Sequence, residues 1–434
     1  MYLSREYAPQ GIGLGPLLQR AQSDKASVKE TVRDVLDTVR LKGDTALYQY
    51  ESQFDNATLS SLEVTEKEFL EAETLVSDSL KQALSHAAKN IRAFHQCQMP
   101  FGEHLVVEEG VELSRKIVPI HTVGLYIPGG TAPLFSTVLM LAIPASVAKC
   151  PCVVMCTPPS KEGKVNPAIL YAAKISGVSK VYKVGGAQAI AAMAYGTESI
   201  GKVDKIFGPG NRFVMEAKLQ VASQCCAIDM PAGPSEVMVI ADRASNPEFV
   251  ASDLLSQAEH GPDSQAMLLL IADREDADVY LDKLEEAIVV QLRALPRTEF
   301  LLSSLSHSHA IVVCDGKSAC AVANAYAPEH LIINTTNADE LEKKIENAGS
   351  IFLGPWSCES AGDYASGTNH TLPTSGWAHS YSGVSVDSFL KKITLQRLSE
   401  QGLRNLAPTI ETMAGFEMLD AHKNAVAIRI GESK

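Results

Sequence analysis

Three polar segments of the sequence carry residues that can bind a metal ion or move protons. Gln257 and His260 lie three residues apart, so in a helix they would share one face. Glu329 and His330 are adjacent in a turn before an apolar run, where histidine can move protons near neutral pH and glutamate can activate water. Asp363 stands in an otherwise nearly uncharged polar stretch, which is typical of a loop that lines a site. These residue types indicate acid–base or metal chemistry.

Two further polar residues, Glu417 and His422, lie near the end of the sequence. Their spacing of five residues does not place them on one face of a regular helix, so they can meet at one ligand only if the helix ends or bends between them. Taken singly, each candidate also has an ordinary interpretation as a helix cap, a surface residue or a salt-bridged pair. Taken together, one glutamine, two histidines and one aspartate offer nitrogen and oxygen ligands of the kind that suit Zn²⁺.

Glycine-rich segments follow three of the predicted strands, at residues 127–130, 184–188 and 207–211. Glycine allows a ligand to approach the backbone closely, and the N-terminus of the helix that follows favours an anion such as phosphate. Each segment alone is better explained as a tight turn, and none has the G-x-G-x-x-G pattern. Because three of them fall at the carboxyl edge of one predicted sheet, we favour a nucleotide or another phosphate ligand there.

The cysteines do not indicate a metal site. There are nine, an odd number spread over a long chain, which favours reduced thiols and a reducing compartment. Cys150, Cys152 and Cys156 flank or occupy an apolar run that we expect to be a buried strand. The adjacent Cys225 and Cys226 lack the spacing of metal ligands.

Composition and charge exclude several classes of protein. The 434 residues are 46% hydrophobic and 21% charged, which is typical of a globular chain long enough for two or more lobes. The net charge of −13 disfavours binding to nucleic acid or an anionic membrane. No apolar stretch is long enough to span a bilayer, and the first 25 residues show no secretory or transit peptide. We therefore expect a cytoplasmic protein, although a processed organelle enzyme would have the same features.

The pattern of apolar residues predicts the elements that must position these groups. Helical spacing extends over 26–97, four strand-then-helix units occupy 123–223, and a second such series occupies 236–353. Repeated strand-then-helix units imply parallel sheets with helices on both faces. The C-terminal tail is predicted to be helical and amphipathic, as at 389–398 and 410–419. Its spacing does not decide whether it packs on its own lobe or on a partner subunit.

We therefore predict an α/β fold with two Rossmann-like, doubly wound lobes, parallel sheets without the G-x-G-x-x-G fingerprint, and a helical C-terminal tail. The expected division comprises an N-terminal arm, a discontinuous first lobe with most of the metal and catalytic residues, a second lobe with the glycine-rich turns, and the tail. These parts correspond to residues 1–25, to 26–121 with 236–384, to 122–235, and to 385–434.

Long runs of the sequence resemble the histidinol dehydrogenase family. The matching runs extend from about residue 30 to about residue 430, almost the full chain. They are VGLYIPGG (123–130), APLFSTVLMLAIPAS (132–146), VGGAQAI (184–190), KVDKIFGPGN (202–211), AIDMPAGPSEV (227–237), DLLSQAEHGPDS (253–264), APEHLI (327–332), SAGDYASGTNHTLPT (360–374) and ETMAGFEMLDAHKNAV (411–426).

The resemblance implies a reaction, two cofactors and a partner. L-Histidinol would be oxidised by two NAD⁺ through L-histidinaldehyde to L-histidine, in the last step of histidine biosynthesis. One Zn²⁺ per subunit would orient the substrate, and the active sites would be shared across a homodimer whose C-terminal tails pack on the partner subunit. The implied zinc ligands are Gln257, His260, Asp363 and, from the other subunit, His422.

The resemblance also implies the roles of individual residues. Glu329 and His330 would be the proton acceptors, His330 for the alcohol and Glu329 for the water that attacks the aldehyde. NAD would be held by Tyr126, Gln188 and Asn211, which lie at the three glycine-rich segments. The implied substrate contacts are Ser235, Gln257, His260, His330, Asp363, Glu417 and His422.

Three alternatives remain open at this point. The chain could be an NAD-dependent dehydrogenase of another small alcohol. It could be a zinc hydrolase in which Glu329 activates water, in which case the glycine-rich turns would be structural. It could also be a two-lobed binding protein without catalytic activity.

Overall fold

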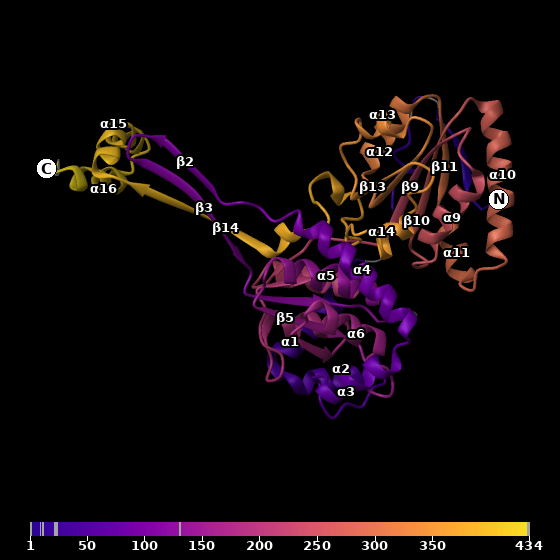
Figure 1. The fold of residues 1–434 in the computed structure, drawn as a ribbon, viewed down its shortest axis with the longest axis horizontal. Coiled ribbons are helices and arrows are strands. Elements are labelled where there is room, and N and C mark those ends of the chain that lie inside the picture. Colours follow the sequence, from indigo (N-terminus) through magenta and orange to yellow (C-terminus); the bar gives the residue numbers. More distant parts are fainter. Residues whose placement is uncertain (1, 9, 11–12, 21–24, 130–131, 432–434) are drawn as a thin grey trace.

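The computed structural model describes residues 2–8, 10, 13–20, 25–129 and 132–431. These residues form two α/β lobes and a long arm that extends away from both (Figure 1). The two lobes with parallel sheets confirm the predicted fold class. Among the described helices, none is long and apolar enough to cross a lipid bilayer.

The first lobe contains a six-stranded parallel sheet with the strand order β1-β11-β10-β9-β12-β13. Its central strands are buried on both faces and therefore read as continuous apolar runs in the sequence. The strands are Ser4–Tyr7 (β1), Glu236–Asp242 (β9), Gln265–Ile271 (β10), His309–Val313 (β11), His330–Asn334 (β12) and Ser350–Leu353 (β13).

Helices cover both faces of this sheet, as the sequence predicted. One face packs against Pro247–Ala258 (α9), Arg274–Leu292 (α10) and Thr298–Leu305 (α11). The opposite face packs against Gly316–Tyr326 (α12) and Ala338–Glu342 (α13). The chain then forms the short helix Glu359–Tyr364 (α14) and two 3₁₀ turns, Trp377–His379 and Val386–Phe389.

The second lobe contains a five-stranded parallel sheet with the order β6-β5-β4-β7-β8. The strands are Thr122–Tyr126 (β4), Cys152–Thr157 (β5), Lys180–Lys183 (β6), Lys205–Phe207 (β7) and Ala227–Ile228 (β8). One apolar core joins the sheet to Glu66–Leu75 (α3), Asp78–Gln96 (α4), Phe135–Val147 (α5) and Pro167–Ser176 (α6). Another core joins it to Lys25–Lys42 (α1), Asp44–Phe54 (α2), Gly186–Tyr195 (α7) and Arg212–Ala222 (α8).

The N-terminal third of the chain differs from the predicted division. The sequence pattern assigns residues 26–121 to the lobe of 236–384, but helices α1–α4 pack in the cores of the five-stranded lobe, as Val32 of α1, Leu47 of α2, Ala72 of α3 and Leu84 of α4 show. Helical periodicity identifies an apolar face without identifying the sheet that covers it. Within the expected N-terminal arm, β1 is the edge strand of the six-stranded sheet.

The arm is an antiparallel sheet of order β14-β3-β2 with two helices at its tip (Figure 1). Its strands are Glu103–Glu108 (β2), Val111–Pro119 (β3) and Leu390–Leu398 (β14), and its helices are Glu400–Phe416 (α15) and Asp420–Ile430 (α16). The predicted helix over 389–398 is therefore wrong. Pairing along the whole length of β3, a segment remote in sequence, overrides the weak helical pattern of β14.

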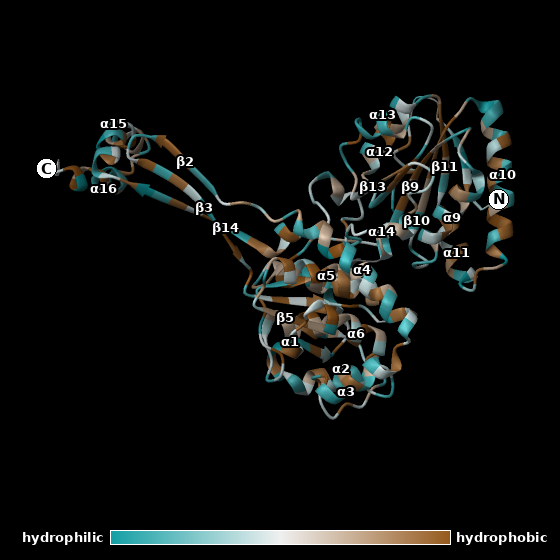
Figure 2. Cartoon of the chain, viewed as in Figure 1, coloured by the Kyte–Doolittle hydropathy of each residue, from teal (hydrophilic) through white to brown (hydrophobic). Residues whose placement is uncertain are grey.

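The arm exposes an unusual amount of apolar surface for part of a single chain. Strand β2 is exposed throughout, and Figure 2 shows hydrophobic residues along the strands and helices of the arm. The large exposed apolar side chains there are Phe101, Leu105, Val106, Val107, Ile393, Leu395, Met413, Phe416, Met418, Leu419 and Ile428. Such a surface marks a contact region.

A buried ion pair fixes the turn after β7. Lys218 Nζ lies 2.5 Å from Asp229 Oδ1 and donates to the Gly208 carbonyl at 2.7 Å, while Asp229 Oδ2 accepts from the Gly208 N–H at 2.8 Å. Both charged side chains are only 1% exposed. Each charge therefore depends on the other for compensation.

We expect Lys218→Met to lower the free energy of unfolding by about 3–5 kcal/mol, because Asp229 would remain buried without its counter-ion. Urea unfolding measures this change. The control is Lys174→Met, which breaks an ion pair with Glu73 that is nearly half exposed and should cost at most about 1 kcal/mol. Equal effects of the two substitutions would contradict this role for the buried pair.

Candidate active site and metal centre

The polar residues predicted to do chemistry gather at the amino ends of the strands of the six-stranded sheet. His330 is the first residue of β12, and Glu329 precedes it. Ser235 is half-buried and precedes β9, and its carbonyl accepts from the Gln265 N–H at 3.1 Å. Gln257 and His260 lie at the end of α9 and just beyond it, directly before β10. The site thus lies opposite the carboxyl edge at which open α/β sheets usually bind ligands.

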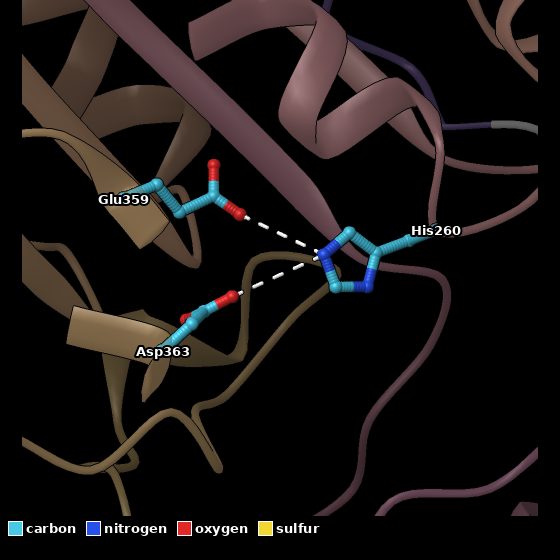
Figure 3. A group of neighbouring side chains, drawn as sticks. All are labelled: His260, Glu359 and Asp363. Atoms are coloured by element: carbon cyan, nitrogen blue, oxygen red, sulfur yellow. Dashed lines mark ion pairs between the residues drawn. The ribbon is translucent and has the colours of Figure 1, made fainter. Parts of the chain in front are cut away.

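Three side chains of this site could hold a metal ion. His260 Nε2 lies 3.9 Å from Asp363 Oδ2 and 4.0 Å from Glu359 Oε1, as Figure 3 shows. One ligand atom from each of the three residues lies within 4.8 Å of the others. Glu359 and Asp363 both belong to α14, where a spacing of four residues places them on one face. That spacing is the signal in the sequence that could have identified Glu359, which was not predicted.

Gln257 joins this group through Glu359. Its side chain is wholly buried, and the orientation of its amide that satisfies the neighbouring acceptors has the nitrogen donating to Glu359 Oε1 at 3.1 Å and to the Glu236 carbonyl at 3.3 Å. The amide nitrogen cannot bind a cation and is held by these acceptors. The amide oxygen is therefore the atom that Gln257 can offer to an ion.

Glu329 and His330 form a buried pair beside the same carboxylates. Glu329 Oε2 accepts from the Glu236 N–H at 2.9 Å and lies 3.7 Å from His330 Nδ1. His330 Nδ1 also lies 3.8 Å from Glu359 Oε1, and His330 Nε2 lies 3.5 Å from Asp363 Oδ1. These distances are long for regular hydrogen bonds, so the ring interacts with the carboxylates mainly through charge.

Burial and crowding of carboxylates shift the pKa values at the site. Burial raises the pKa of Glu329 to about 8, and burial with neighbouring carboxylates raises the pKa of Glu359 to about 8. Burial opposes the charged form of His330, but Glu359, Glu329 and Asp363 outweigh it and raise the pKa of His330 to about 10. The site contains three acid groups, Glu329, Glu359 and Asp363, beside the imidazoles of His260 and His330.

The donor set fits a divalent cation such as Zn²⁺. Nitrogen and oxygen donors are those that zinc binds in proteins, and a cation would compensate the excess of buried carboxylates. Among the described residues, the buried atoms Glu359 Oε2 and Asp363 Oδ1 make no hydrogen bond. Unpaired buried oxygens of this kind need a partner.

Glu417 and His422 are not brought to this site by their own chain. α15 ends at Phe416, Glu417 follows as its C-cap, and α16 begins at Asp420, so the helix does break between the two residues. Both side chains are exposed. They lie at the tip of the arm, which extends away from the six-stranded lobe (Figure 1).

The residues predicted to bind NAD line one cavity on the second lobe. Tyr126, Gln188 and Asn211 face a cavity of about 880 Å³ at the carboxyl ends of the five-stranded sheet. A cavity of this volume can hold a dinucleotide. The structure therefore separates a nucleotide-sized cavity on one lobe from the imidazole–carboxylate cluster on the other.

Several backbone amides of the glycine-rich turns are already hydrogen-bonded within the protein. Glu51 Oε1 accepts from the Gly185 N–H at 3.1 Å, and the Tyr126 hydroxyl accepts from the Gly186 N–H at 3.1 Å. The Gly208 N–H donates to Asp229. These three amides do not offer the free donors that the sequence suggested for a phosphate.

A hydrogen bond links the loop of the metal site to the second lobe. His370 hydrogen-bonds the Asp363 carbonyl at 3.1 Å through Nδ1 and the Thr137 hydroxyl, on α5, at 3.2 Å through Nε2. Asn369 donates to the Met140 carbonyl of the same helix at 2.6 Å. The position of α14 is thus coupled to the lobe that carries the cavity.

A nucleotide-sized cavity on one parallel α/β lobe and a buried imidazole–carboxylate cluster on the other are features of a two-lobed α/β enzyme that acts on small molecules. Comparison with known proteins specifies the family. The histidinol dehydrogenase family model matches residues 18–430. The chain belongs to the histidinol dehydrogenase family, whose members are oxidoreductases.

Individual relatives are similar over nearly their whole length. Histidinol dehydrogenase of Bacteroides thetaiotaomicron is 55% identical over 418 residues, which cover 96% of each chain. The Escherichia coli K12 enzyme is 52% identical over 420 residues, which cover 96% of this chain and 95% of that one. A crystal structure of histidinol dehydrogenase from Elizabethkingia anophelis superimposes with a TM-score of 0.95 at 48% identity and covers 99% of this chain and 98% of that one.

The buried Glu51 beside the cavity predicts an unusual dependence of stability on pH. Burial raises its pKa from 4.5 to about 8, so the folded protein keeps a proton that the unfolded chain releases. The free energy of unfolding should therefore fall as the pH rises from about 4.5 to about 8.

Glu51→Gln mimics the protonated acid and should reduce this fall in the free energy of unfolding. Urea unfolding at several pH values measures it, with the exposed Glu109→Gln as control. A fall as steep in Glu51→Gln as in the wild type would contradict a protonated Glu51.

Proposed function

We propose that this protein oxidises L-histidinol through L-histidinaldehyde to L-histidine, the last step of histidine biosynthesis, with two NAD⁺ and one Zn²⁺ per subunit. The observation that carries the proposal is the convergence of His260, Glu359 and Asp363 beside the buried Glu329–His330 pair, in a chain of this family. We place the reaction in the cytoplasm, with no nucleic-acid or membrane partner.

Gln257, His260 and Asp363 are the residues of one chain that would hold the zinc ion, and the partner subunit's His422 would complete the set. Bound Zn²⁺ would orient the imidazole and amine of histidinol and would offset the carboxylate charge that otherwise keeps His330 protonated. In our proposal Ser235 and His330, which lie at the same strand edge, contact the substrate.

The exposed arm supports a homodimer with shared active sites. Glu417 and His422 have no role within their own chain's cluster, and large apolar side chains such as Phe416 and Met418 surround them at 88% and 85% exposure. In our proposal the arm lies on the other subunit. Glu417 then supplies a negative charge for the substrate ammonium, and His422 supplies a zinc ligand.

His330 and Glu329 divide the proton transfers. His330 takes the hydroxyl proton of histidinol as the carbinol carbon gives up hydride, which leaves the aldehyde. Glu329 removes a proton from the water that attacks the aldehyde, and the hydrate then gives up the second hydride and a proton to form the carboxylate. Tyr126, Gln188 and Asn211 would hold NAD⁺, which would supply the acceptor for each hydride.

The stoichiometry of the reaction tests the proposed function. We expect about two NADH for each L-histidinol consumed, because two hydrides leave one carbon before the product is released. Absorbance of NADH and chromatography of histidine measure both quantities. One NADH with free aldehyde would contradict the four-electron reaction, and turnover without NAD⁺ would instead support a hydrolase.

Metal analysis separates ligands from proton acceptors. His260→Ala should lose most of the bound zinc, because it removes one donor of the cluster, whereas His330→Asn should keep the zinc and lose activity by about a hundredfold or more. Elemental analysis of purified subunits measures this difference, with the exposed His121→Ala as control. Zinc loss in His330→Asn would make His330 a ligand.

Mixing two inactive variants tests the shared site. In heterodimers of His422→Ala and His330→Asn chains, one of the two sites combines an intact His330 with an intact His422. A random mixture should therefore recover about a quarter of the wild-type activity. No recovery, despite heterodimers detected by mass spectrometry, would exclude a contribution from the partner's tail.

A further inference from the structure

The N-terminal segment that packs on the six-stranded lobe ends beside the candidate active site. Leu14 is buried in the core on the α12 face of the sheet, and Leu17 and Leu18 pack against that core. Arg20, the last residue of the described segment 13–20, reaches Glu236, the first residue of β9. The proposed reaction uses neither charged side chain, so this contact needs an explanation of its own.

Arg20 binds the buried carboxylate of Glu236 through two hydrogen bonds. Its Nε donates to Glu236 Oε2 at 2.5 Å, and its Nη2 donates to Glu236 Oε1 at 2.8 Å. The Glu236 side chain is 2% exposed, and the Arg20 side chain is 22% exposed. A guanidinium with both donors on one carboxylate fixes the orientation of that carboxylate and compensates a charge that would be costly to bury alone.

The same guanidinium holds the turn that leads to β12. Arg20 Nη2 also donates to the Tyr326 carbonyl at 2.7 Å, and Arg20 Cζ lies 3.9 Å from the centroid of the Tyr326 ring. The Tyr326 hydroxyl lies 3.3 Å from Glu236 Oε2 and donates to Gln265 Oε1 at 2.6 Å. Tyr326 is the last residue of α12 and stands three positions before Glu329. Arg20 therefore connects the start of β9 to the turn that presents Glu329.

The two segments that Arg20 connects determine where the Glu329 carboxylate lies. The backbone of Glu329 follows the turn held at Tyr326, and Glu329 Oε2 accepts from the Glu236 N–H at 2.9 Å. A displacement of the turn or of the Glu236 backbone would therefore displace this carboxylate. In the proposed reaction Glu329 removes a proton from the water that attacks the aldehyde, and such a proton transfer depends strongly on the position of the acceptor.

We propose that Arg20 is a positioning residue for the oxidation of the aldehyde, because through Glu236 and the Tyr326 carbonyl it fixes the carboxylate of Glu329. His330, the proton acceptor of the first oxidation, belongs to β12 and is held by the pairing of that strand with β9 and β13. Loss of Arg20 should therefore affect the second oxidation more than the first. This inference rests on the proposed function, because it assumes that Glu329 activates water.

The test compares the two oxidations in the Arg20→Ala variant. Stopped-flow absorbance measures the first NADH formed from L-histidinol, and steady-state absorbance measures the NADH formed from added L-histidinaldehyde. We expect kcat for L-histidinaldehyde to fall about tenfold or more, with KM within about twofold of the wild type, because the acceptor is displaced while the substrate contacts remain. The first hydride transfer from L-histidinol should fall by less than about threefold. Zinc content, measured by elemental analysis, should stay at the wild-type level.

The matched control is Arg5→Ala, in the same N-terminal region. The Arg5 side chain is 17% exposed and pairs with Asp282 of α10 at 2.8 Å, away from Glu236 and Tyr326. This variant should leave both oxidations unchanged. If Arg20→Ala does not fold, as judged by urea unfolding, Arg20→Lys replaces it in the same measurements. Lysine keeps the charge of Glu236 compensated but lacks the planar fork, so it should show the same difference between the two oxidations with a smaller loss.

The two oxidations also separate failure of this inference from failure of the proposed function. An unchanged kcat for L-histidinaldehyde in the folded, zinc-loaded variant would overturn the role of Arg20, and so would an equal loss of both oxidations. A wild-type protein that oxidises neither L-histidinol nor L-histidinaldehyde would instead overturn the proposed function.

Discussion

The crowding of buried acid groups around His330 is the constraint on which the rest of this structure depends. Glu329, Glu359 and Asp363 lie within 3.8 Å of one imidazole, and burial makes each uncompensated charge costly. A cation at His260 and Asp363, as we propose, would compensate the charge of these groups. Asp363, which we propose as a ligand of the ion, also raises the pKa of His330, so metal binding and proton transfer would not be adjusted independently.

The two lobes contribute opposite edges of their sheets to this arrangement. The six-stranded sheet presents strand amino ends, where Ser235 and His330 meet the end of α9, and the five-stranded sheet presents strand carboxyl ends, where Tyr126 opens onto the cavity. The loop that follows Asp363 is tied to α5 through His370. The position of the cluster is therefore coupled to the lobe that carries the cavity.

Much of this structure could be predicted from the sequence, because strand-then-helix repeats and buried apolar strands are local patterns. Strand β14 could not be predicted from local patterns because it forms by pairing with Val111–Pro119, which is remote in sequence. The lobe of α1–α4 could not be predicted because the apolar face of a helix does not indicate which sheet it packs against. Glu359 was missed because a six-residue helix has too little periodicity to stand out. The predicted ligands Gln257, His260 and Asp363 do lie together, whereas His422 lies exposed on α16, away from them.

Anomalous diffraction at the zinc absorption edge, from crystals of the zinc-loaded protein, tests the central claim most directly. The account predicts one peak per subunit, about 2.0–2.2 Å from His260 Nε2, an Asp363 oxygen, the Gln257 amide oxygen and the partner subunit's His422. A peak coordinated by Glu359 instead of Gln257, or completed within a single chain, would contradict it.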